Sequence, residues 1–181
     1  MKRLCLCLLA LALLLGGCGR SGEAERRERL AEELKAGREL RFTAALRAEY
    51  PDRTVSFRLA YEEDAEGCTL RVLEPEEISG LSLRLGSDGA RLRFEELSLD
   101  AGPLDRFGLS PVSALPALAQ ALREGHLESA WREEGLTVWE LASDGELRVR
   151  VRLDEALTPR SAELISEGRA AVYLEIEDWE Q

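Results

Sequence analysis

Residues 40–61 read LRFTAALRAEYPDRTVSFRLAY, and this stretch is the clearest indication of the fold class. Apolar side chains occupy alternate positions on both sides of Pro51, from Leu40 to Tyr50 and from Val55 to Tyr61. This alternation is typical of strands with one buried face and one solvated face. The proline and aspartate between the two runs favour a turn. The stretch therefore predicts an antiparallel β-hairpin.

The same alternation recurs along most of the remaining chain. Further apolar stripes lie within residues 68–72, 81–85, 90–94, 139–141, 147–153 and 172–176. Glycines in the short connections between them favour hairpin turns. The pattern predicts an antiparallel meander of roughly nine or ten strands.

The lengths of the connections predict which residues face each other. Four-residue loops at 51–54 and 86–89 pair the apolar stripes of their strands, Leu46 with Leu59 and Leu83 with Leu92. Three-residue loops that end in glycine are expected at 133–135, 143–145 and 166–168. With these lengths Trp131 and Trp139 lie on the same face of the sheet.

Two segments have helical rather than alternating periodicity. Residues 23–37 place Leu30, Ala31 and Leu34 on one face and predict an amphipathic helix. A second helix is expected before Gly125, with a stripe of Leu115, Leu118, Ala119 and Leu122, and its apolar composition predicts burial. Ser110 or Ser113 can cap this helix. Ser113 is favoured, because Pro116 then falls in the first turn.

The sizes of these elements predict the architecture. Roughly nine or ten strands at ~4.8 Å spacing make a sheet more than ~40 Å wide, whereas a helix of about ten residues is only ~15 Å long. One short helix cannot cover such a sheet, so the sheet must curl around it. The fold class is therefore expected to be mainly β (α+β), a curled antiparallel meander that forms an unclosed half-barrel with one or two helices in its concave face.

The N-terminus has the features of a secretory signal. Lys2 and Arg3 precede an apolar run of 12 residues, Leu4 to Leu15, which is too short to span a membrane. Leu15-Gly16-Gly17-Cys18 resembles the lipobox of bacterial lipoproteins. This resemblance implies cleavage before Cys18 and a diacylglyceryl group on its sulfur. An ordinary secretory signal that happens to end near a cysteine is the alternative.

The predicted domain organisation follows from this signal. Residues 1–17 are a lipoprotein signal peptide, 18–29 a flexible tether, and 30–181 a folded domain. We expect a protein on the extracytoplasmic side of the cell membrane, anchored through diacylglyceryl-Cys18. The prediction does not distinguish an inner from an outer membrane.

Composition argues against several functions. The chain carries 24 Lys and Arg against 35 Asp and Glu, a net charge of −11, which disfavours nucleic acid and anionic lipid surfaces as partners. The single histidine, His126, is expected in a capping or solvated position, and paired-histidine zinc motifs are excluded. No catalytic motif is present, so we expect a protein without enzymatic activity, metal or cofactor.

Three features have two readings each. The acidic cluster at 62–66 is expected to be a solvated turn rather than a calcium loop, because it lacks the spacing of such loops. The many arginines on the polar face favour cross-strand pairs with glutamates over a docking surface for an acidic partner. Cys68 is expected to be a buried, unreactive core residue rather than one half of an intermolecular disulfide.

Three segments together resemble a known family. They are Leu73-Glu74-Pro75-Glu76-Glu77-Ile78-Ser79-Gly80 between two strands, the helix after the fifth strand, and Leu157-Thr158-Pro159-Arg160 before a last hairpin about Glu167-Gly168. This layout, over about residues 28 to 178, resembles the LolA/LolB-like lipoprotein carrier superfamily, closest to its small, lipid-anchored, GerS-like members of Gram-positive bacteria. The resemblance implies an unclosed half-barrel with an apolar hollow.

The sequence leaves two main functions open. The first is a binding protein that holds an acyl chain, lipid or lipopeptide in the concave face. The residues expected to line that hollow are Phe42, Leu46, Phe57, Leu59, Leu83, Leu92, Leu115, Leu118, Leu122, Trp139 and Val149. The second is a lipid-anchored module, monomeric like the first, that has a self-filled core and contacts an envelope or spore-germination protein. An enzyme is a distant third.

Overall fold

Eleven strands in the described part of the chain form one antiparallel sheet, accompanied by two α-helices and a short 3-10 helix. The computed structural model describes residues 18–37, 39–87, 89–102, 109–143 and 146–181. The strands are β1 (Leu40–Glu49), β2 (Thr54–Asp64), β3 (Gly67–Glu74), β4 (Ser82–Gly86), β5 (Gly89–Phe94), β6 (Leu97–Gly102), β7 (His126–Glu133), β8 (Leu136–Ala142), β9 (Arg148–Leu153), β10 (Pro159–Ser166) and β11 (Arg169–Glu180). The helices are α2 (Cys18–Ala36), η1 (Glu76–Ile78) and α3 (Pro111–Glu124).

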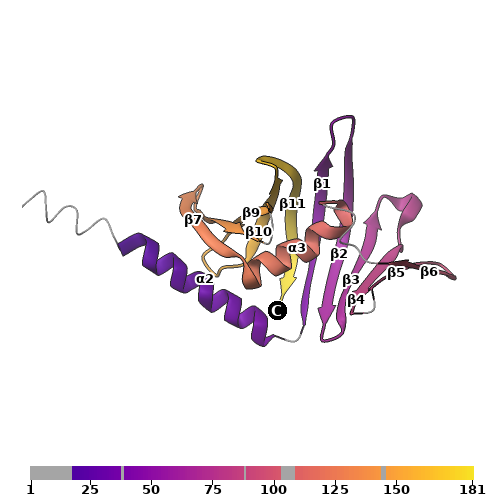
Figure 1. Cartoon of the computed structure of the whole chain (residues 1–181), viewed down its shortest axis with the longest axis horizontal. Helices are drawn as coiled ribbons and strands as arrows, with labels where there is room; N and C mark the ends of the chain where they lie inside the picture. Colours follow the sequence, from indigo (N-terminus) through magenta and orange to yellow (C-terminus); the bar gives the residue numbers. More distant parts are fainter. Residues whose placement is uncertain (1–17, 38, 88, 103–108, 144–145) are drawn as a thin grey trace, which may run out of the picture.

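The order of the strands explains how the sheet is built. It runs β6-β5-β4-β3-β2-β1-β11-β10-β9-β8-β7, so the first and last strands pair at its centre. The chain builds one half outward to β6, returns through α3, and builds the other half inward from β7. The sheet curves around α3 and is not closed into a barrel (Figure 1). This is the unclosed half-barrel that the sequence predicts.

The concave face carries the core. The alternate apolar positions of β1 are buried, and those of β8 to β11 are buried with them, whereas the intervening side chains are mostly half-buried or exposed. On α3 the predicted stripe of Leu115, Leu118, Ala119 and Leu122 packs onto this face with at most 1% of each side chain exposed. The expected buried helix is confirmed, and it ends before Gly125, whose N–H donates to the carbonyl of Ala121.

The N-terminal helix is longer than the sequence predicts. Leu30, Ala31 and Leu34 are buried as expected, but α2 begins at Cys18, so residues 18–29 are helical rather than a flexible tether. No apolar stripe precedes Leu30 to indicate this. A polar contact holds this part of the helix: the indole Nε1 of Trp139 donates to the carboxylate of Glu23 at 2.9 Å. Apolar periodicity does not predict such a contact. None of the described helices is long and apolar enough to cross a membrane.

Several hairpins are offset from the predicted register. The pair Leu83–Leu92 is observed as predicted. Leu46 faces Phe57 rather than Leu59, because the four-residue turn spans 50–53 instead of 51–54. Leu141 faces Val149 rather than Leu147, because the connection after β8 is longer than the expected loop at 143–145. The offset is two residues. Since side chains alternate with a period of two, the apolar stripes still share a face.

The turn after β7 is one residue shorter than predicted, and this difference changes which face a side chain occupies. Glu133 pairs with Leu136, so the turn contains two residues, Glu134 and Gly135, and both have positive φ. The expected three-residue loop was wrong, and so was the one at 166–168, where Ser166 pairs with Arg169 across a two-residue turn. A change of one residue reverses the face, and Trp131 therefore lies opposite to Trp139: it is 38% exposed, whereas Trp139 is 0% exposed.

The start of α3 also differs from the favoured prediction. Ser110 is the N-cap: its hydroxyl accepts the N–H of Ser113, and the Ser113 hydroxyl accepts the N–H of Ser110. Pro111 occupies the first turn, where no intrahelical N–H bond is lost. Pro116 lies inside the helix. The pair of serines makes a reciprocal cap that satisfies two N–H groups at the start of the helix, and Pro116 removes one intrahelical hydrogen bond further along.

Candidate ligand-binding site

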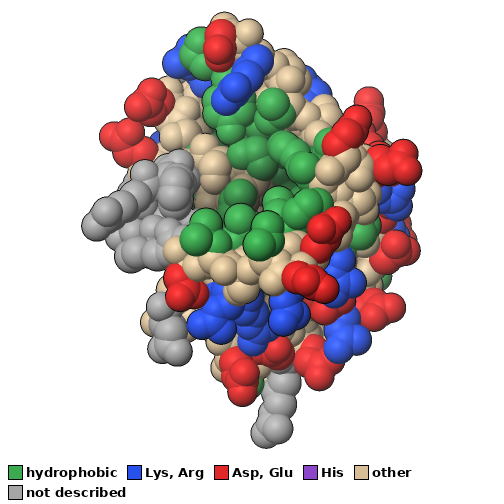
Figure 2. Space-filling model, turned by 90° about the vertical axis from the view of Figure 1, so that its right-hand side faces the viewer, with side chains coloured by type: hydrophobic (Ala, Val, Ile, Leu, Met, Phe, Trp, Pro, Cys, Tyr) green, Lys and Arg blue, Asp and Glu red, His purple; other side chains and the backbone are tan. Residues whose placement is uncertain are grey.

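An apolar cavity of about 430 Å³ lies in the concave face, between β2–β5 and the N-terminal end of α3. It is lined by Phe57, Leu59, Leu70, Val72, Ile78, Leu81, Ser82, Leu83, Leu92, Ser110, Pro111 and Val112. Figure 2 views the molecule from the side of β4–β6 and shows hydrophobic side chains gathered around a hollow, with charged side chains outside it. The cavity is open to solvent on this side.

Four of the predicted binding residues meet in this cavity. Phe57 and Leu59 come from β2, Leu83 from β4 and Leu92 from β5. Their strands pair in register, with Leu59 opposite Val72 and Leu83 opposite both Leu70 and Leu92. Because side chains alternate along each strand, this register places all four side chains on the same face of the sheet.

The rim contains residues that the sequence analysis did not assign to the site. Between β3 and β4 the chain turns through η1, and Val72 exchanges hydrogen bonds with this connection, to Leu81 O at 2.8 Å and from Gly80 N at 2.9 Å. Gly80 has a φ of +88°, which a glycine adopts without strain. The turn therefore places Ile78 and Leu81 at the mouth. The apolar residues Ile78 and Leu81 themselves were the only indication of this in the sequence.

The other seven predicted residues lie in the packed core, away from the cavity. Their exposed fractions are 3% for Phe42, 2% for Leu46, 1% for Leu122, and 0% for Leu115, Leu118, Trp139 and Val149. Side chains of the protein itself fill the space around them. The predicted hollow is therefore self-filled beneath α3 and open only beyond its N-terminal end.

A polar clamp holds the C-terminal end of α3 on the sheet. Nη1 of Arg123 donates to both carboxylate oxygens of Glu63 at 2.8 Å, and its Nε donates to the carbonyl of Leu34 in α2 at 3.3 Å. The hydroxyl of Tyr61 donates to the same carboxylate at 2.7 Å. The clamp ties the C-terminal end of α3 to β2 and α2.

Cys68 lies beside this clamp. It is 8% exposed, so the prediction of a buried residue is confirmed. Burial raises the pKa of its thiol to about 11, and the nearby charge of Glu63 also raises it. Burial raises the pKa of Tyr61 as well. A thiol of this kind is protonated at neutral pH and therefore a poor nucleophile.

The acidic cluster at 62–66 covers the end of β2 and the two-residue turn after it, and an ion pair holds this turn. Both carboxylate oxygens of Asp64 accept from Arg84, at 2.7 and 3.0 Å, and one also accepts from the N–H of Glu66. These bonds, chiefly those from Arg84, lower the pKa of Asp64 to about 2. Over the described ranges no group of three or more His, Cys, Asp or Glu side chains is arranged to hold a metal ion.

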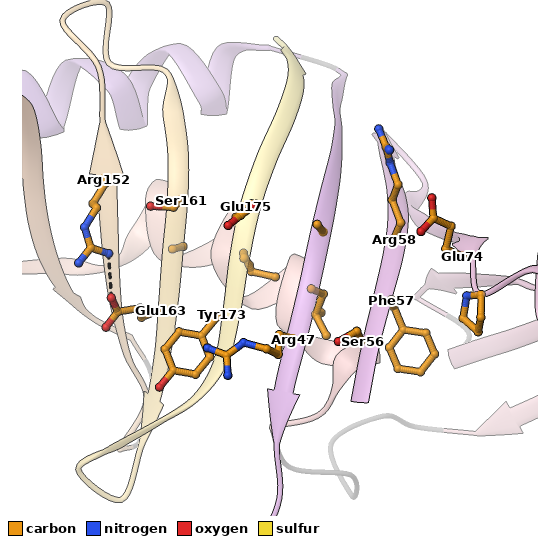
Figure 3. A pocket seen from close by; sticks show the side chains of 15 residues that line it. Arg47, Ser56, Phe57, Arg58, Glu74, Arg152, Ser161, Glu163, Tyr173 and Glu175 are labelled. Atoms are coloured by element: carbon orange, nitrogen blue, oxygen red, sulfur yellow. Dashed lines mark hydrogen bonds and ion pairs between the residues drawn. The ribbon is translucent and has the colours of Figure 1, made fainter. Parts of the chain in front are cut away.

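The convex face carries the polar side chains, among them those of a shallow groove of about 590 Å³ (Figure 3). Its arginines are engaged: Arg152 donates to Glu163 at 2.8 Å, and the guanidinium of Arg47 lies 4.2 Å from the ring centre of Tyr173. The neighbouring Arg150 bridges Glu140 and Glu163 at 3.2 and 3.1 Å. These pairs confirm the expected cross-strand network. His126 is exposed at the start of β7.

No family model matches the chain, and no curated protein matches it. Solved structures do resemble its fold. An uncharacterized conserved protein from Thermus thermophilus has a TM-score of 0.52 at 12% identity, over 88% of this chain and 87% of that chain. A LolA superfamily protein from Nitrosomonas europaea has a TM-score of 0.47 at 13% identity, over 87% of this chain and 92% of that chain.

A third similar structure is the CwlD amidase from Clostridioides difficile in complex with the GerS lipoprotein. Its matching chain has a TM-score of 0.44 at 13% identity, over 87% of this chain and 95% of that chain. The superfamily that the sequence resembles is thus represented among the similar structures. At these identities the similarity concerns the fold alone.

Proposed function

We propose that the protein is a lipid-anchored extracytoplasmic protein that binds an apolar ligand in the cavity between β2–β5 and α3, without transforming it. The ligand is an acyl chain of a lipid or lipopeptide. The observation that supports this most directly is the lining of the cavity, which is apolar except for Ser82 and Ser110. Its volume of about 430 Å³ lies within the range of ~300 to 1,000 Å³ typical of ligand pockets.

The energetics of such binding require no charged group. Burial of about 300 Å² of acyl chain contributes ~7.5 kcal/mol at ~25 cal/mol per Å², before the costs of ordering and association are subtracted. The rim leaves one side of the cavity open, so a polar headgroup can remain in water while the chain is buried. An apolar pocket of this kind therefore favours amphipathic ligands.

The membrane attachment rests on Leu15-Gly16-Gly17-Cys18. A diacylglyceryl group on Cys18 supplies two acyl chains, which is what stable anchoring needs. Cys18→Ser is expected to release the protein from the membrane fraction or leave an uncut precursor. An unchanged mass and unchanged fractionation of this variant would contradict the anchor.

One observation favours the second function, docking of an envelope protein. Leu97 and Leu99 on the edge strand β6 are 74% and 64% exposed. They pair with Phe94 and Leu92, so they continue the apolar face of the cavity to the edge of the sheet. A partner that covers them would also cover the cavity mouth.

Binding of a fluorescent fatty-acid analogue to the purified protein tests the first function, together with mass spectrometry of lipid that copurifies with it. Leu92→Trp fills the cavity and is expected to weaken binding at least tenfold. Arg93→Trp is the matched control, because Arg93 is adjacent in β5 but exposed on the other face. If neither the wild type nor the control binds the analogue and no lipid copurifies, the binding function is wrong and docking takes its place.

A further inference from the structure

The helix α2 is fixed to the domain almost from its first residue. Glu23 accepts the indole N–H of Trp139 at 2.9 Å, and Trp139 is fully buried in β8. Further along, Leu30 and Leu34 are buried against the core, and the carbonyl of Leu34 accepts from Arg123 of α3. The contacts therefore extend from Glu23 over three turns of the helix.

The proposed lipidation site lies close to the first of these contacts. Cys18 is the first residue of α2 and precedes Glu23 by five positions. At ~1.5 Å per residue in a helix, the two backbone positions are about 7.5 Å apart. A lipid on Cys18 would thus be joined to the domain by little more than one helical turn.

This end of α2 lies beside one edge of the sheet. Ala24 and Arg27 face His126–Ala130 of β7 across a groove, and Glu23 contacts β8. The cavity lies in β2–β5, toward the other edge. Between β8 and β4 the sheet order contains seven spacings, or about 34 Å along the sheet at ~4.8 Å per strand.

The mouth of the cavity and the start of α2 also face different directions. In Figure 1 the start of α2 lies at the left of the molecule and β4–β6 lie at the right. Figure 2 looks at that right-hand side, and the hollow opens toward the viewer. The cavity therefore opens away from the end that carries Cys18.

We propose that α2 fixes the orientation of the domain on the bilayer, with the β7–β8 edge against the lipid surface and the cavity opening away from it. This inference rests on the proposed anchoring and binding functions. It has a consequence for the ligand: neither the protein's own acyl chains nor the lipid directly beneath it reach the cavity. The ligand is a separate apolar molecule that enters from the aqueous side.

Fluorescence quenching on vesicles tests this orientation. The lipidated mature chain, residues 18–181, with Cys68→Ala is labelled at a single introduced cysteine, Glu134→Cys in the exposed β7–β8 turn or Ser98→Cys on the exposed edge strand β6. It is then reconstituted into phosphatidylcholine vesicles that contain a nitroxide-labelled lipid. The label at Glu134→Cys is expected to be quenched several-fold more strongly than the label at Ser98→Cys.

A linker variant supplies the control. A flexible Gly-Ser insertion after Gly22 leaves the contact between Glu23 and Trp139 intact but frees the domain from the anchor. The difference between the two labels should disappear in this variant.

Equal quenching without the insertion, or stronger quenching at Ser98→Cys, would overturn the orientation while leaving anchoring and binding intact. A chain that fails to bind vesicles would overturn the anchoring premise and the orientation with it. Loss of binding of the fatty-acid analogue, with the quenching difference intact, would instead refute only the function of the cavity.

Discussion

The two halves of the concave face are built from the same alternating pattern but are covered differently. Over β8–β11 and β1 the apolar positions are sealed by α3 and α2, and Trp139, Val149 and Leu164 are fully buried. Over β2–β5 the corresponding side chains surround a cavity, and Phe57, Val72 and Leu92 are only partly buried. Identical strand chemistry therefore gives a core in one half and a pocket in the other.

The length of α3 accounts for the difference. Its 14 residues span about 21 Å, whereas the sheet of 11 strands is about 48 Å wide along its curve. The helix ends at Gly125, beside Ala142 of β8, and its first turn forms one wall of the cavity. One helix of this length fills one half and leaves the other open.

The largest expected effect separates the two tryptophans of the β7–β8 hairpin. Trp139→Ala removes a fully buried ring from the sealed half, and is expected to lower the free energy of unfolding by ~3 to 5 kcal/mol. Trp131→Ala on the opposite face should change it by less than ~1 kcal/mol. Urea denaturation followed by circular dichroism measures both, and equal losses would mean that Trp139 is not part of a packed core.

A smaller effect distinguishes the halves directly. Leu118→Trp inserts a larger side chain where no space remains, and overpacking is expected to lower the free energy of unfolding by ~1 to 3 kcal/mol. Leu92→Trp should cost less than ~1 kcal/mol, since its ring can occupy the cavity. If both variants are destabilised alike, the half over β2–β5 is a packed core in solution.

The smallest effect concerns Cys68, which lies beside the polar clamp at the C-terminal end of α3. Its thiol should react with a maleimide at pH 8 much more slowly in the folded protein than in urea, and the rate should rise as the pH approaches about 11. Ser98→Cys in a Cys68→Ala background is the exposed control. Fast labelling of Cys68 at pH 8 would show that this end opens readily.

The same pKa predicts a pH dependence of stability. The unfolded thiol ionises near pH ~8.5, whereas the folded thiol remains neutral up to about pH 11. The contribution of Cys68 is therefore complete below the unfolded pKa and is lost as the pH rises between these values. Cys68→Ala should remove this part of the alkaline loss of stability.

The sequence predicts the face of the sheet on which a side chain lies more reliably than the residue opposite it on the next strand. At the β1–β2 turn an error of two residues left every side chain on its expected face, although Leu46 pairs with Phe57 instead of Leu59. At the turn after β7 an error of one residue placed Trp131 on the wrong face. Loop length is the weak step, because glycine at the last position suits both two-residue and three-residue turns. Strand β6 was missed, since only Leu97 and Leu99 mark it.

The candidate site was predicted in part for the same reason. Period-two alternation places all the apolar strand residues on one surface, so Phe57, Leu59, Leu83 and Leu92 were found together with residues such as Trp139 that α3 covers. Val112 and Pro111 were not found, because they reach the cavity only through the path of the chain from β6 to α3.

Local periodicity and turn residues were enough to predict the antiparallel strands and the buried helix, because each of these features is expressed within a short segment. The lipid anchor at Cys18 stays a prediction. The tertiary structure was needed to show which half of the concave face is filled, and that residues 18–29 continue a helix held by Glu23 and Trp139. Both depend on where α3 and α2 lie relative to strands far away in the chain. The periodicity of a single segment carries no information about where a helix packs on distant strands.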